Sequence, residues 1–166
     1  MKENKFLFGL LILLAAGISA NANFIYAQTN DSRLYGTWIF DKIVEVYNDF
    51  EDEMADQFDG PVDLGALTKE MGLIEMTITN TTYEITMNGI QFGRGVYTAV
   101  NGVLSTNITH IHGSAIGLDS QWHSIAEMQQ RFGIEFPDLS ETINYSINGN
   151  ILTAVNNYMK TLYRRK

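Results

Sequence analysis

The chain has 166 residues, no cysteine and a formal net charge of −8, and 45% of its residues are apolar. The absence of cysteine excludes disulfides, thiolate metal sites, a cysteine nucleophile and a lipid-modified cysteine. The negative charge disfavours nucleic acid as a partner, and the apolar content argues against a disordered chain. We therefore expect one folded domain that relies on its own hydrophobic core.

The first 22 residues have the pattern of a secretory signal peptide. Lys2 and Lys5 precede an apolar run over residues 6–16, and Ala20-Asn21-Ala22 follows as a cleavage site. The run is shorter than the roughly 20 apolar residues that a membrane-spanning helix needs. We expect cleavage after Ala22, or as late as Ala27. The mature protein should then be periplasmic or secreted, with neither a lipid anchor nor a membrane span.

Residues 23–33 are predicted to form a polar leader, and the domain is predicted to span residues 34–166. In the acidic segment after the first strand, apolar residues recur at every fourth position from Phe50 to Phe58. This spacing predicts a helix over residues 49–59, which Gly60-Pro61 ends. A second short helix is predicted from Leu64 to Met71.

From residue 73 onward, apolar and polar residues alternate, which is typical of strands with one buried face. Asn-Gly pairs at residues 88–89, 101–102 and 148–149 predict two-residue hairpin turns, because such turns favour positive φ. These patterns predict eight strands, at about residues 35–47, 73–79, 82–88, 91–99, 103–112, 142–148, 151–155 and 158–164. Eight antiparallel strands in a meander can close into a barrel without free edges.

A helical insertion is predicted between the fifth and sixth strands. Asp119-Ser120 can cap a helix in which Trp122, Ile125, Met128 and Phe132 share one face. The glycines of Gly93-Arg94-Gly95 indicate a bend or a close backbone contact in a strand, because a phosphate-binding loop would need a following Lys and Ser or Thr.

The first and the last predicted strands resemble those of the lipocalins and the wider calycin group. Gly36-Thr37-Trp38 is similar to their Gly-x-Trp signature, and residues 161–166 are similar to the basic last strand of small bacterial lipocalin-like domains. The resemblance implies an all-β fold with minor helices, an eight-stranded antiparallel up-and-down β-barrel. It also implies that Arg164 or Arg165 lies over the Trp38 ring and closes the barrel floor, a structural role rather than a catalytic one.

The alternation also places a set of apolar and tyrosine side chains inside the barrel. They suit a small, mostly apolar ligand whose one or two polar groups bond to the tyrosines, but they equally suit a fully packed core. The facing of strands 91–99 and 103–112 stays unassigned. The predicted lining consists of Ile74, Met76, Ile78, Tyr83, Ile85, Met87, Ile143, Tyr145 and Ile147.

The three histidines are a candidate metal site. His110 and His112 share one face of a predicted strand and His123 lies nearby in the sequence, a set that zinc accepts. Histidines that are hydrogen-bonded or face solvent are the alternative interpretation, and it is preferred. No nucleophile elbow or buried carboxylate pair stands out, so we assign no catalytic residue, no cofactor and no metal.

The sequence thus predicts an exported binding protein without enzymatic activity, whose ligand is small and mostly apolar. The alternative is a solid barrel that acts through its surface as an interaction or inhibitor module. In that case the acidic helix 49–59 and the helix around Trp122 would form the face for a protein partner of unknown kind.

Overall fold

The computed structural model of the chain describes residues 30–47, 63–134, 136 and 139–166. The predicted signal peptide, most of the polar leader and the predicted helix over residues 49–59 lie outside the described residues. Within the described ranges, no helix is long and apolar enough to cross a membrane.

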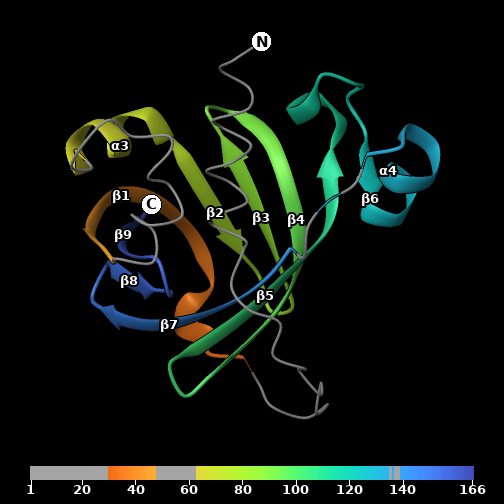
Figure 1. The fold of residues 1–166 in the computed structure, drawn as a ribbon. Helices are drawn as coiled ribbons and strands as arrows, with labels where there is room; N and C mark the ends of the chain where they lie inside the picture. The colour runs from red at the N-terminus through yellow and green to blue at the C-terminus, as the bar shows by residue number, and fades with distance from the viewer. Residues whose placement is uncertain (1–29, 48–62, 135, 137–138) are drawn as a thin grey trace.

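Eight antiparallel strands close into one barrel (Figure 1). Each pairs with its neighbour in the chain, and the last pairs with the first, so the sheet has no free edge along the ring. This confirms the predicted up-and-down barrel and its eight strands. They are β1 (Gly36–Val46), β2 (Ile74–Ile78), β3 (Thr82–Met87), β4 (Ile90–Val100), β5 (Val103–His112), β7 (Ser140–Asn148), β8 (Ile151–Val155) and β9 (Met159–Arg165).

Short helices interrupt the meander at the two predicted places. The helix α3 (Leu64–Met71) follows β1, and α4 (Ile125–Phe132) lies between β5 and β7. The bounds of α3 agree with the prediction because Asp63 caps it, accepting hydrogen bonds from the backbone N–H groups of Gly65 and Ala66. Two 3-10 turns, η1 (Ser32–Leu34) and η2 (Gly113–Ile116), complete the helical content of the described residues.

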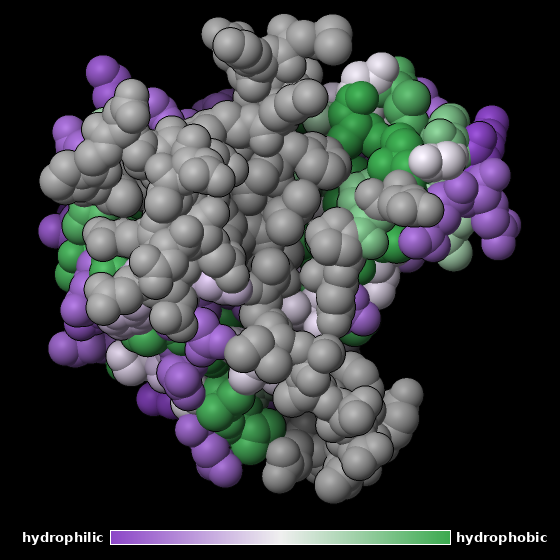
Figure 2. Space-filling model, viewed as in Figure 1, coloured by the Kyte–Doolittle hydropathy of each residue, from purple (hydrophilic) through white to green (hydrophobic). Residues whose placement is uncertain are grey.

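The prediction that α4 begins at Asp119-Ser120 is wrong. Ser124 caps the helix by accepting from the Glu127 N–H, while Trp122 and His123 belong to an additional strand, β6 (Trp122–Ser124). This strand pairs with the end of β5 and thereby satisfies backbone groups that a longer helix would have used internally. Figure 2 shows apolar side chains gathered over the region of η2, β6 and α4, with hydrophilic ones at its outer edge.

The Asn-Gly pairs mark hairpins, but not all in the same way. Asn88-Gly89 has φ of 50° and 80°, and Asn101-Gly102 has φ of 53° and 80°, as predicted for turns that need two positive values. At the third pair, Asn148 is still on the strand and faces Ile151. The turn there is Gly149-Asn150, in which only Gly149 has positive φ, so the predicted turn is displaced by one residue.

Bulges explain why the sequence could not assign the facing of β4 and β5. The register shifts opposite Ile85/Thr86 and again at Arg94/Gly95, leaving Phe92 and Thr109 as extra residues in their strands. Each bulge reverses the alternation of buried and exposed side chains. Gly95 confirms the predicted close contact, because a Cβ at this position would overlap the backbone carbonyl of Asn107.

Arg165 closes the barrel floor over Trp38, which settles the choice that the resemblance left open. The guanidinium lies 4.4 Å from the centroid of the fully buried indole. It also donates hydrogen bonds to the carbonyls of Tyr35, at 3.0 Å, and Arg33. The indole N–H donates to the Leu34 carbonyl at 2.7 Å, so both side chains hold η1 across this end of the barrel. Arg164 instead pairs with Asp41 on the outside.

The two arginines provide a matched test of this floor. Arg165→Met should lower the free energy of unfolding by about 2 kcal/mol, because it removes the cation–π contact and two charge-assisted hydrogen bonds. Arg164→Met removes a side chain that is 65% exposed, and the loss should stay below about 1 kcal/mol. Urea unfolding of both variants measures the difference, and equal losses would contradict the proposed role of Arg165.

Candidate functional site: a cavity inside the barrel

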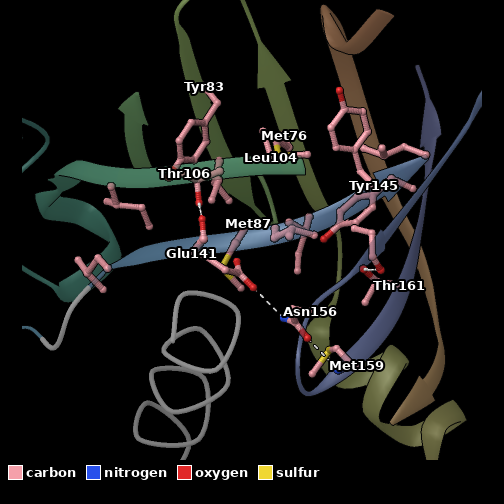
Figure 3. A pocket seen from close by; sticks show the side chains of 18 residues that line it. Met76, Tyr83, Met87, Leu104, Thr106, Glu141, Tyr145, Asn156, Met159 and Thr161 are labelled. Carbon is pink, nitrogen blue, oxygen red and sulfur yellow. Dashed lines mark hydrogen bonds between the residues drawn. The ribbon is translucent and has the colours of Figure 1, made fainter. Parts of the chain in front are cut away.

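The barrel encloses a cavity of about 100 Å³ (Figure 3). It extends from the middle of the barrel toward the end at which β7 and β9 begin, opposite the floor made by Trp38 and Arg165. Most of the lining side chains are apolar. The lining consists of Ile74, Met76, Tyr83, Ile85, Met87, Leu104, Thr106, Ile108, Leu139, Glu141, Ile143, Tyr145, Leu152, Ala154, Asn156, Met159, Thr161 and Tyr163.

Seven of the nine side chains predicted from the alternation reach this cavity: Ile74, Met76, Tyr83, Ile85, Met87, Ile143 and Tyr145. The other two do not. Ile78 is 3% exposed and Ile147 packs against the same core, but both lie near the ends of their strands, toward the floor. Alternation fixes which face of a strand a side chain occupies, whereas the depth of a cavity along that face depends on how the ends are filled.

One of the tyrosine hydroxyls predicted to bond to a ligand, that of Tyr145, is hydrogen-bonded within the floor instead. Tyr145 donates to Asp31 Oδ2 at 2.9 Å, and Arg33 forms an ion pair with the same oxygen at 2.7 Å. The hydrogen bond from Arg33 lowers the pKa of Asp31 to about 2, which keeps this carboxylate charged. Burial together with this carboxylate raises the pKa of Tyr145 to about 12. The Tyr145 hydroxyl is therefore part of the floor.

Glu141, at the start of β7, is the only ionisable side chain besides the tyrosines among the described residues of the lining. It is 7% exposed, and its Oε1 accepts a hydrogen bond of 2.7 Å from Asn156 Nδ2 (Figure 3). Among the described residues, Oε2 has no hydrogen-bond partner and no cation lies beside it. A carboxyl group with one unused oxygen thus faces an otherwise mainly apolar space.

The turn between β8 and β9 fixes the position of Asn156. Its Oδ1 accepts from the backbone N–H groups of Tyr158, at 2.9 Å, and Met159, at 2.8 Å. With the oxygen held by the backbone, the amide nitrogen must point toward Glu141. The turn thus holds Asn156, and Asn156 in turn orients the carboxyl group of Glu141.

Burial raises the pKa of Glu141 to about 8, although the hydrogen bond from Asn156 acts in the opposite direction. Removing a carboxylate from water disfavours its charged form, and one amide donor compensates only in part. Glu141 is therefore mainly a neutral carboxylic acid at pH 7. Burial, followed by the charge on Glu141, also raises the pKa of the Tyr163 hydroxyl to about 12.

The sequence patterns did not single out Glu141 or Asn156. The predicted sixth strand begins at residue 142, whereas β7 begins at Ser140. Extending the alternation of Ile143 and Tyr145 back by two residues places Glu141 on the inner face, so a signal was present. Asn156 lies in a turn, where no periodicity applies, and only the closed barrel brings it to Glu141.

The three histidines do not form a common site. On β6, His123 lies opposite Ile111, so it faces away from the side of the sheet that carries His110 and His112. Its ring hydrogen-bonds to Asp119, at 2.8 Å, and Glu127, at 3.2 Å, and these carboxylates raise its pKa. Within the part of the chain that the structure describes, no cluster of potential ligands could hold a metal ion.

The raised pKa of Glu141 predicts a pH-dependent stability. Between its ordinary pKa of 4.5 and its folded value of about 8, the unfolded chain binds fewer protons than the folded one. The free energy of unfolding must therefore fall as the pH rises through this window. Glu141→Gln removes the ionisation, so we expect the variant to gain a few kcal/mol relative to the wild type between pH 5 and pH 9.

Urea unfolding at both pH values measures this gain. Glu84→Gln is the matched control, because Glu84 is an exposed residue of β3 and its replacement should leave the pH dependence unchanged. Parallel pH profiles for the wild type and Glu141→Gln would show that this carboxyl group is not buried as described.

Among solved structures, the chain is similar to a lipocalin-like protein from Bacteroides uniformis. The TM-score is 0.41 at 13% sequence identity, and the match covers 80% of this chain and 98% of that chain. No protein-family model and no curated protein matches the chain. The lipocalin-like architecture therefore rests on the chain itself, on its closed ring of eight antiparallel strands and on Arg165 over Trp38.

Proposed function

We propose that this protein is an exported binding protein for a small, mostly apolar ligand, held inside the barrel. The observation that carries the proposal is the cavity itself, a space of about 100 Å³ with a mainly apolar lining. A barrel whose only task was to present a surface would be more stable with this space filled, because cavities cost stability. The signal-like residues 1–22 support export, and no catalytic set accompanies the cavity among the described residues.

The size of the cavity limits the ligand. A cavity of roughly 150 Å³ can hold benzene, so the body that fits without rearrangement is about one small ring or a short alkyl chain. Met76, Met87 and Met159 belong to the lining. Because methionine side chains are unbranched and adaptable, they allow modest expansion around a somewhat larger ligand.

A titration with a small neutral compound tests the proposal without presupposing a headgroup. Isothermal titration calorimetry of the purified protein with 1-hexanol should show saturable binding at one site per chain. Ala154→Phe places a ring in the cavity and should weaken this binding at least about tenfold, since the ring takes the space that the ligand needs.

Thr153→Phe is the matched control. Thr153 precedes Ala154 on β8 and points to the opposite face of the sheet, so the same added ring should leave binding unchanged. Absence of saturable heat for hexanol and for its aromatic counterpart, benzyl alcohol, would contradict the proposal. It would favour the alternative of a solid barrel that acts through its surface.

A further inference from the structure

The cavity contains a carboxyl group, that of Glu141, which a purely apolar ligand could not pair with. Glu141 is buried, and among the described residues its Oε2 has no partner and no Lys, Arg or His belongs to the lining. The Asn156 amide, which donates to Oε1, is held in place by its own turn. A buried carboxyl group in an apolar cavity costs free energy unless it gains a partner.

From this geometry we infer that the barrel selects a small amine with an apolar body, whose ammonium group binds Glu141 while its hydrocarbon part occupies the cavity. The inference rests on the proposed function and specifies its ligand class. An ammonium group supplies what the site lacks, a positive charge and a hydrogen-bond donor aimed at Oε2. The Asn156 amide, which already donates to Oε1, keeps the carboxylate oriented during binding.

The charge of the whole chain acts in the same direction. The formal net charge is −8, which raises the local concentration of cations near the protein and lowers that of anions. A fatty acid of the same size is disfavoured twice. It is repelled on approach, and its carboxylate would lie beside Glu141 with no described cation between the two groups.

The site also couples amine binding to the loss of a proton. At pH 7 the empty site is mainly neutral, so an incoming ammonium must first displace the Glu141 proton to solvent. Among the described residues of the lining, the other titratable side chains are Tyr83 on β3, Tyr145 on β7 and Tyr163 on β9, and burial raises the pKa of all three. These hydroxyls stay neutral between pH 6 and pH 9, which leaves Glu141 as the group that titrates.

Three six-carbon compounds test the inference: hexylamine, 1-hexanol and hexanoate. Calorimetric titrations of the purified protein at pH 9 should show that the amine binds at least about tenfold more tightly than the alcohol, as expected for a charge-assisted hydrogen bond. Its affinity should rise by about tenfold between pH 7 and pH 9, as Glu141 ionises. The affinity of the alcohol should not rise, and that of hexanoate should fall.

Glu141→Gln should abolish the preference for the amine over the alcohol and the pH dependence of amine binding. Glu84→Gln removes the same charge outside the barrel, and this variant should retain both the preference for the amine and its pH dependence. Should the wild type bind the alcohol but prefer the amine at neither pH, the inference would be wrong and the proposed function would stand. Should it bind none of the three compounds, the proposed function would fail as well.

Discussion

The pairing of β9 with β1 is the constraint on which the interior depends. Without it the eight strands would form an open sheet with two free edges and no enclosed space. Arg165 lies at this seam. Its guanidinium covers the Trp38 ring and holds the carbonyls of residues 33 and 35, so the last strand, the first strand and η1 become one unit. Because this floor fills one end of the barrel, the cavity lies toward the other end.

That division gives the two ends different chemistry. At the floor, polar groups are satisfied within the protein, as with Tyr145, Asp31 and Arg33. In the cavity, Glu141 has one partner, and Oε2 has none among the described residues. Oε2 thus faces the space of the cavity, where a hydrogen-bond donor of a ligand could reach it. The contrast within one barrel makes the cavity end, rather than the floor, the place where binding is expected.

The same carboxyl group connects stability with binding. Burial makes its charged form unfavourable, so the empty barrel is less stable at high pH, where the group must ionise. A bound ammonium would offset that cost, and the pH range in which the empty protein is weakest is the range in which it would bind an amine best. A fully packed core would leave no space for a ligand beside Glu141, whereas the observed cavity of about 100 Å³ provides it.

The sequence by itself determined the strand count, most strand bounds, two of the hairpin turns and seven of the cavity residues, because alternation and turn chemistry are local. It could not determine the facing of β4 and β5, since the bulges at Phe92 and Thr109 arise from pairing with other strands. It also placed Trp122 on a helix, because the pairing of β6 with β5 leaves no periodic signal. Arg165 over Trp38 and Asn156 beside Glu141 bring together residues that are far apart in the chain or belong to different elements. Only closure of the barrel decides such contacts.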